Sequence, residues 1–166
     1  MAISIPPYNL LKSNFPAVKA ESVKKLIGGN VDAPYIRNTC AIRISRALNY
    51  SGAPLPSGTS KSFVRVSGAD KKWYALRIRE LRTYLQATYG PPSLKTHKKI
   101  PPSEWALAQG IIMFDVHGWT DATGHMDLWN GYTCEYEGYW SRSFEVYLWA
   151  SKSAVSPSQT NLTNSP

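Results

Sequence analysis

The sequence is poor in cysteine and has no long apolar stretch. Only Cys40 and Cys134 occur in 166 residues, too few for the disulfide framework of a small secreted scaffold. No apolar run approaches the roughly 20 residues that a membrane-spanning helix needs. The first eleven residues lack the charged start and long apolar core of a secretory signal. We therefore expect a protein that is made in the cytoplasm without a signal peptide and that contacts no membrane.

Acidic residues are also scarce, and they are unevenly placed. The chain has 19 Lys and Arg against 11 Asp and Glu, which gives a formal charge of +8. Residues 1–100 hold 17 of these basic side chains and 4 acidic ones, so the charge lies in the front of the chain. A basic helix face over residues 71–89 could bind nucleic acid. Because no nucleic-acid motif accompanies it, we expect a solvated surface and no nucleic-acid partner.

Hydrophobic spacing predicts helices in the first part of the chain and strands in the second. The expected helices cover residues 20–27, 39–49 and 71–89. The expected strands of an antiparallel meander cover residues 110–116, 125–129, 132–140 and 144–150, with a turn at Asn130-Gly131. The proline-containing start and residues 94–102 are expected to be irregular. This order indicates one α+β domain over residues 1–150, and the composition of residues 151–166 predicts a disordered tail.

Cys40 is placed where a thiol can become a nucleophile. It lies in the first turn of the helix expected over residues 39–49, where free N–H groups and the helix dipole stabilise a thiolate. Arg37 and Arg43 add positive charge, and the same N–H groups can hold an oxyanion. A small buried cysteine on a core-facing helix explains the pattern equally well. Both interpretations stay open on this spacing alone.

A nucleophilic cysteine requires a base, and His125 is the best placed of the three histidines. His97 lies in a lysine-rich stretch, whereas His117 and His125 bracket the loop between two expected strands. His125 opens its strand, where a side chain can project toward a helix end. A helix cysteine followed by a strand histidine is the order of papain-like peptidases. Cys134 is expected to be packed or unreactive.

A third group must orient the imidazole ring, and the residues leave several alternatives. Glu137 faces His125 if the Asn130-Gly131 turn takes three residues. Glu135 lies at a similar height, and Asp127 shares a strand face with His125. Glu137 is the preferred third catalytic residue on hairpin geometry, with a main-chain carbonyl as the remaining alternative.

A metal or cofactor site has little support in the sequence. There is no close pair of His or Cys residues at the usual ligand spacing, and no Gly-rich phosphate loop occurs. We therefore expect no metal and no cofactor. A zinc cluster would have to combine residues from the following set: His117, His125, Asp115, Asp121 and Asp127.

Two long motifs resemble one family. Residues 38–49, Asn-Thr-Cys-Ala-Ile-Arg-Ile-Ser-Arg-Ala-Leu-Asn, look like the cysteine helix of the type VI secretion amidase effectors, fourth family. Residues 122–131, Ala-Thr-Gly-His-Met-Asp-Leu-Trp-Asn-Gly, look like its histidine strand. Residues 110–114 with Gly118-Trp119 are similar to its preceding strand and loop. The similarity spans roughly residues 35–149.

The resemblance implies a papain-like, NlpC-type cysteine peptidase in which Cys40 is the nucleophile and His125 the base. Members are injected into the periplasm of rival bacteria and cut the peptidoglycan stem between D-glutamate and meso-diaminopimelate. It implies delivery by the type VI secretion machinery and a cognate immunity protein as partner. The expected substrate contacts are Asn38, Arg43, Trp119 and Trp129.

The sequence also departs from the family pattern. Members often carry Cys-x-Asp-x-Cys after the hairpin, with the aspartate as third catalytic residue and a disulfide around it. Here Tyr136 stands at the aspartate position and Gly138 at that of the second cysteine. The disulfide is therefore not available to Cys134, and the third catalytic residue stays open. An inactive relative that binds cell wall without cutting it is the alternative interpretation.

Overall fold

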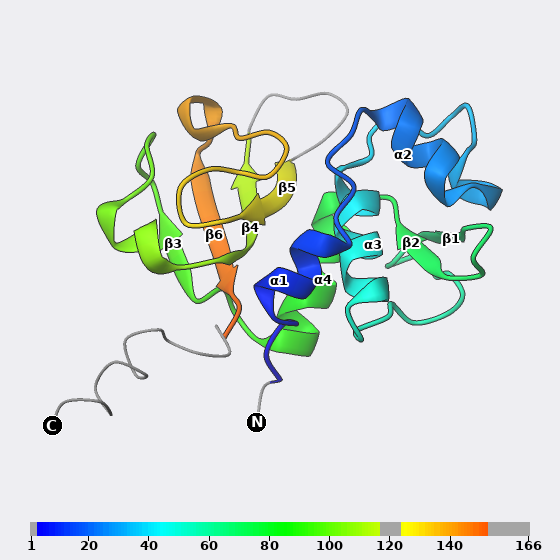
Figure 1. Ribbon diagram of the computed structural model, residues 1–166, viewed down its shortest axis with the longest axis horizontal. Coiled ribbons are helices and arrows are strands. Elements are labelled where there is room, and N and C mark those ends of the chain that lie inside the picture. Colours follow the sequence, from blue (N-terminus) through cyan, green and yellow to red (C-terminus); the bar gives the residue numbers. More distant parts are fainter. Residues whose placement is uncertain (1–2, 117–123, 153–166) are drawn as a thin grey trace, which may run out of the picture.

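The computed structural model describes residues 3–116 and 124–152 and arranges them as helices beside an antiparallel sheet (Figure 1). The helices are α1 (Tyr8–Ser13), α2 (Ala20–Ile27), α3 (Cys40–Tyr50) and α4 (Ile78–Tyr89), with short 3-10 turns η1 (Gly29–Val31), η2 (Ser103–Leu107) and η3 (Trp140–Arg142). The strands are β1 (Arg65–Ser67), β2 (Trp73–Ala75), β3 (Leu94–Thr96), β4 (Gly110–Asp115), β5 (Gly124–Trp129) and β6 (Glu145–Ala150). The expected α+β class is thereby confirmed. Within the described ranges, no helix is long and apolar enough to cross a membrane.

The main sheet has four antiparallel strands in the order β3-β6-β4-β5. It is not the simple meander expected from the sequence, because β6 lies between β3 and β4 instead of extending one edge. The register aligns four residues in one row across the sheet: Thr96, Val146, Phe114 and His125. Strand β5 is an edge strand, and α3 packs against it. This packing brings the start of α3 to the row that contains His125.

Each face of the sheet is covered by its own apolar cluster. Met126 and Leu128 of β5 join a core with residues of α1, α3 and α4, whereas Trp129 packs on the opposite face with Trp105 of η2. Alternation along β5 therefore puts His125, Asp127 and Trp129 on the face opposite Met126 and Leu128. The buried strands β4 and β5 fix the position of His125 on a rigid element.

The helix predicted over residues 71–89 is wrong in its first third. Residues 73–75 form β2, which pairs with β1, and α4 begins only at Ile78. Lys71 has a φ of 64°, which a right-handed helix excludes. The carboxylate of Asp70 accepts hydrogen bonds from the Lys72 main chain at 3.0 Å and the Tyr74 hydroxyl at 2.6 Å, so it stabilises a hairpin turn. The helical spacing of apolar residues over 71–89 therefore did not distinguish the strand β2 from the helix α4 that follows it.

The expected strand over residues 132–140 is also wrong, because only Cys134 forms an isolated bridge, to Trp129. The Asn130 side chain accepts from the main chains of Tyr132 at 2.8 Å and Thr133 at 2.9 Å, which replaces strand pairing with a side-chain-stabilised loop. Helix α1 and strand β3 form in segments expected to be irregular. Pro7 flanks the start of α1, where a missing N–H costs nothing.

Candidate active site

Cys40 is the first residue of α3, as expected for a nucleophile at a helix N-terminus. Its side chain is half-buried and its thiol is free of any disulfide. The Oδ1 atom of Asn38 accepts a hydrogen bond from the Cys40 main-chain N–H at 2.9 Å. Asn38 therefore orders the main chain that leads into the helix and lies directly beside the thiol-bearing residue.

The structure brings His125 to Cys40 across 85 residues of sequence. The Sγ atom of Cys40 and Nδ1 of His125 are 2.8 Å apart, which is within hydrogen-bond distance. His125 is 2% exposed, so its ring is held by protein rather than by solvent. The N-terminus of α3 supplies the thiol and the edge strand β5 supplies the imidazole. The two groups are close enough for the imidazole to act as a base toward the thiol.

The far nitrogen of the ring meets a main-chain carbonyl. Nε2 of His125 lies 2.8 Å from the carbonyl oxygen of Glu137 and 3.4 Å from Oδ2 of Asp127. A carbonyl oxygen can only accept, so Nε2 carries the hydrogen. In the neutral ring Nδ1 is then the unprotonated nitrogen, and it faces the thiol. This tautomer is the one that can take the proton from Cys40.

Asp127 is the buried carboxylate beneath this arrangement, with no exposed surface. Its two oxygens accept hydrogen bonds from the main-chain N–H groups of Leu128 at 2.7 Å, Tyr136 at 3.2 Å and Glu137 at 2.7 Å. The bonds to Tyr136 and Glu137 hold the loop whose carbonyl reaches the ring. Asp127 therefore acts on His125 both by its charge and by positioning the Glu137 carbonyl.

Aromatic rings enclose the imidazole. The ring of Tyr139 meets His125 edge-on at 4.6 Å between centroids, and Phe114 stacks against it at 6.2 Å. Burial lowers the pKa of His125, but hydrogen bonds and charges from Asp127 and Cys40 outweigh burial and raise the pKa to about 9. The imidazolium form is thus favoured when the thiolate is present. The contacts of Phe114 and Tyr139 with the imidazole could not be predicted from the sequence, where these residues are part of an apolar pattern only.

The two other acidic candidates lie in different surroundings. The Glu137 side chain is exposed, and this residue reaches the ring through its main chain. Glu135 points to α1, where its Oε1 accepts from the Tyr8 hydroxyl at 2.8 Å and lies 3.8 Å from Nζ of Lys12. The carboxylate near the ring belongs to Asp127.

Arg43 has a different position from the one expected of a substrate contact. It is 3% exposed, and its guanidinium donates to the carbonyls of Pro16 at 2.7 Å and Val18. It also lies over the ring of Tyr136, at 3.8 Å from the centroid. Arg43 therefore joins the N-terminal segment, α3 and the loop that carries Glu137, and its donors are used inside the protein.

Of the two tryptophans expected to wall a substrate groove, the structure describes only Trp129. Trp129 is 1% exposed, and its Nε1 donates to the carbonyl of Trp105 at 3.1 Å, so it belongs to the core. Trp119 and His117 lie outside the described residues. Within the described ranges, no group of three or more His, Cys, Asp or Glu side chains could hold a metal ion.

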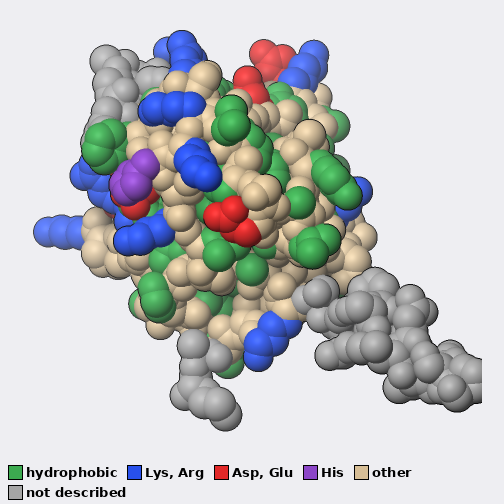
Figure 2. All heavy atoms as spheres, turned by 90° about the vertical axis from the view of Figure 1, so that its left-hand side faces the viewer, with side chains coloured by type: hydrophobic (Ala, Val, Ile, Leu, Met, Phe, Trp, Pro, Cys, Tyr) green, Lys and Arg blue, Asp and Glu red, His purple; other side chains and the backbone are tan. Residues whose placement is uncertain are grey.

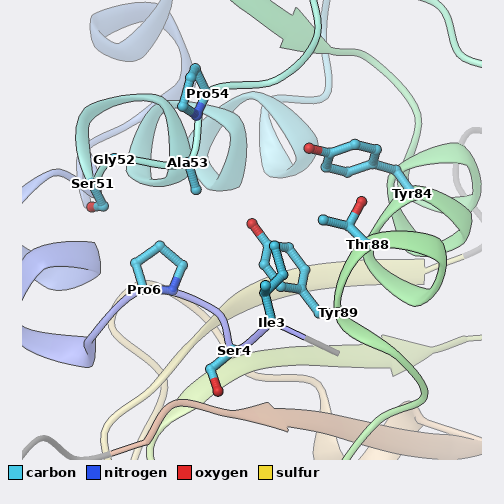
Figure 3. Close-up of a pocket in the computed structure, with 10 residues that line it drawn as sticks. All are labelled: Ile3, Ser4, Pro6, Ser51, Gly52, Ala53, Pro54, Tyr84, Thr88 and Tyr89. Carbon is cyan, nitrogen blue, oxygen red and sulfur yellow. The ribbon is translucent and has the colours of Figure 1, made fainter. Parts of the chain in front are cut away.

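A separate hollow of about 360 Å³ lies between the N-terminal segment and the end of α4 (Figure 3). Ile3 and Pro6 line it on one side, and Tyr84, Thr88 and Tyr89 of α4 line another. Its lining includes neither Cys40 nor His125 and carries no charged side chain. The hollow is therefore separate from the Cys40–His125 pair at the junction of α3 and β5.

Comparison with known proteins places this chain in a family. The model of type VI secretion system (T6SS) amidase effector protein 4, Tae4, matches residues 36–155. The chain belongs to the Tae4 family. No curated protein matches the chain.

Solved Tae4 structures have the same fold. The Tae4 effector from Enterobacter cloacae is 36% identical, covers 92% of this chain and 100% of its own, and superposes with a TM-score of 0.80. The Tae4–Tai4 effector–immunity complex from the same organism matches at 35% identity, 89% and 99% coverage and a TM-score of 0.79. The corresponding complex from Salmonella Typhimurium matches at 32% identity, 87% and 97% coverage and a TM-score of 0.78. The fold is therefore papain-like and of the NlpC type.

Proposed function

We propose that this Tae4-family chain is an antibacterial peptidoglycan amidase that uses Cys40 as a nucleophile. The bond to be cleaved joins the γ-carbonyl of D-glutamate to the amine of meso-diaminopimelate in the peptide stem. The observation that supports this proposal is the 2.8 Å separation of the Cys40 Sγ and the His125 Nδ1, with Nε2 held by the Glu137 carbonyl. Membership of an amidase effector family supplies the substrate class.

The first half of the reaction forms an acyl-enzyme. His125 takes the thiol proton through Nδ1, and the Cys40 thiolate adds to the γ-carbonyl carbon. The imidazolium that forms is stabilised by Asp127, and it then protonates the departing diaminopimelate amine. The C–N bond breaks, and a thioester joins Cys40 to the glutamyl group.

The second half releases the glutamyl group as a carboxylate. His125 is neutral again after giving up its proton, so Nδ1 can activate a water molecule for attack on the thioester. The tetrahedral intermediate collapses, and the Cys40 thiolate leaves. One water is consumed per bond, and the enzyme returns to its starting protonation state.

The developing oxyanion needs donors near the start of α3. The Cys40 main-chain N–H is bound to Oδ1 of Asn38 in this structure. We assign this N–H to the oxyanion, so the substrate oxygen replaces the Asn38 acceptor during attack. Asn38 thus keeps the donor satisfied until substrate arrives.

The partners follow from the family. The relatives from Enterobacter cloacae and Salmonella Typhimurium are described as effector–immunity complexes with Tai4. We extend to this chain a cognate immunity protein, delivery by the type VI secretion machinery, and action in the recipient periplasm. In this proposal the cognate immunity protein inhibits the effector and so protects the producing cell.

The proposal is tested by digesting purified peptidoglycan and identifying the fragments by mass spectrometry. The unaltered protein is expected to release stems with a new diaminopimelate amine, and digestion in ¹⁸O-water should label the glutamyl γ-carboxylate. Cys40→Ala should lose this activity. Cys134→Ala removes the other thiol and should retain it. Release of the same fragments by Cys40→Ala would refute the nucleophile, and a different cleaved bond would refute the specificity.

A further inference from the structure

The edge of the sheet opposite the active site is strongly basic. Lys95 of β3, Lys98 and Lys99 of the following turn, and Arg142 of η3 are all exposed, and we call these four residues the basic edge. Figure 2 shows the face of the molecule at this side, where Lys and Arg side chains gather around a histidine. The proposed chemistry uses none of these residues.

The basic edge is in register with the active site. Thr96 pairs with Val146, Val146 with Phe114, and Phe114 with His125. Three strand spacings of about 4.8 Å separate the ends of this row, a distance of about 14 Å. Residues 97–99 follow Thr96 directly, so they lie at the same end of the sheet as His125. A polymer seated at Cys40 can therefore extend toward the basic edge.

The charge of this edge is largely uncompensated. Across residues 3–116 and 124–152, no carboxylate lies within 4.0 Å of the basic edge's charged nitrogens. Lys99 donates its Nζ to the carbonyl of Ser143, which ties the turn to the neighbouring segment. Arg82 of α4 lies over the ring of Tyr147, the pairing partner of Lys95, and adds a further positive charge. Glu145 and Asp115 are the nearby acidic residues, paired across β6 and β4.

We propose that the basic edge is a second attachment surface for peptidoglycan, distinct from the Cys40–His125 site that cuts it. The inference rests on the proposed function, because it takes the substrate to be a polymer. Each stem carries carboxylates at D-glutamate and diaminopimelate, and stems repeat along every glycan strand. The backbone row that joins Thr96 to His125 is about 14 Å long, so the exposed Lys and Arg near its far end can bind the carboxylates of a neighbouring stem while one stem occupies the active site. The enzyme then stays on the wall between cleavages.

Binding is measured without cleavage by using Cys40→Ala protein and purified sacculi in a sedimentation assay over a series of salt concentrations. The test variant carries Lys95→Gln, Lys98→Gln and Arg142→Gln, and leaves Lys99 to hold Ser143. The control variant carries Lys19→Gln, Lys25→Gln and Lys61→Gln, which removes the same charge from exposed positions at the N-cap of α2, on α2 and before β1.

The test variant is expected to bind sacculi roughly tenfold more weakly than its parent, as three exposed charge contacts together would contribute. Its binding should also depend less on salt, whereas the control variant should bind like the parent. Equal binding by the test and control variants would overturn the proposal. Tighter binding of the parent to phosphatidylglycerol vesicles than to sacculi would overturn the choice of partner.

A second measurement separates this inference from the proposed function. In proteins that retain Cys40, hydrolysis of the soluble tripeptide L-Ala-γ-D-Glu-meso-diaminopimelate should be equal in the test and control variants, because it cannot span both surfaces. Hydrolysis of intact sacculi should fall only in the test variant. Failure of the unaltered protein to hydrolyse the tripeptide would refute the proposed function and leave the sacculus-binding result standing.

Discussion

Replacing Asp127 with asparagine tests how the imidazole is held and charged. The substitution preserves the shape of the side chain but removes its charge. It also replaces one of the two accepting oxygens with an NH₂ group. In the unaltered protein, Oδ2 of Asp127 accepts a hydrogen bond from the Glu137 main-chain N–H at 2.7 Å and lies 3.4 Å from Nε2 of His125. Asp127→Asn therefore removes the negative charge beneath the ring and loosens the loop that supplies the ring's carbonyl partner.

The magnitude follows from the pKa of His125. A rise from the ordinary 6.5 to about 9 favours the imidazolium by about 3 kcal/mol, because each pKa unit is worth 1.36 kcal/mol. Asp127 and Cys40 both contribute to this rise against the cost of burial. Since burial opposes the rise, these two groups together favour the imidazolium by more than this net amount. Removing an opposite charge this close to a titrating group typically shifts its pKa by about 1–3 units. Loss of the Asp127 charge should therefore lower the pKa of His125 by about one unit or more and reduce kcat/KM roughly tenfold. Because a buried N–H also loses its acceptor, stability should fall by about 1–3 kcal/mol.

The assay is the pH profile of kcat/KM on a soluble stem peptide, measured below the unfolding temperature of the variant. The alkaline limb should move down by about one pH unit in Asp127→Asn. Glu137→Gln and Glu135→Gln are the matched controls, since neither of these side chains lies at the ring, and both should retain the profile of the unaltered protein. Loss of activity in Glu137→Gln together with an unchanged profile in Asp127→Asn would refute the reasoning.

Three further outcomes are expected. In the unaltered protein kcat/KM should decline above about pH 9, because the pKa of His125 is raised to about 9 and above that pH the Cys40–His125 pair lacks the proton that the ring must give to the leaving amine; a decline near pH 7 would contradict this. Gly138→Cys should form a disulfide with Cys134, because a Cβ at this glycine would lie 3.3 Å from the Cys134 Sγ atom. Closing the five-residue loop should stabilise the protein by about 2 kcal/mol. Two free thiols at these positions after oxidation would refute this prediction. Arg43→Gln should lower the unfolding free energy by about 2 kcal/mol in a denaturant titration, since a charged donor to the carbonyls of Pro16 and Val18 is lost; a change below about 0.5 kcal/mol would contradict the packing role.

The sequence predicted the pair of elements that carries the proposed chemistry. The apolar spacing around Cys40 is regular over three turns, and the alternation through His125 is strict, so α3 and β5 formed where expected. It could not predict the strand β2, because its apolar residues continue the spacing of α4. The left-handed conformation of Lys71 and the hydrogen bonds of the Asp70 carboxylate decide that segment, and neither appears in a hydrophobic pattern.

The sequence left several candidates open as the partner of the far imidazole nitrogen, and it did not decide between an acidic side chain and a main-chain carbonyl. Hairpin geometry favoured the Glu137 side chain, but the loop does not continue as a strand. Asp127 binds the main chain of this loop and turns the Glu137 carbonyl toward the ring. Sequence reasoning assigned Arg43 to substrate because its charge is visible, whereas the carbonyls that bind it belong to a distant segment.

The carbonyl of Glu137 has a consequence for recognising enzymes of this kind. A main-chain acceptor is supplied by whichever residue stands at that point of the loop, so replacing the side chain does not remove it. Searches that require the aspartate of the Cys-x-Asp-x-Cys motif after the hairpin would reject such a chain as inactive. The feature to look for is instead a carboxylate two residues after the histidine that can hold the returning loop. Loss of a motif aspartate is therefore a poor criterion for loss of catalysis.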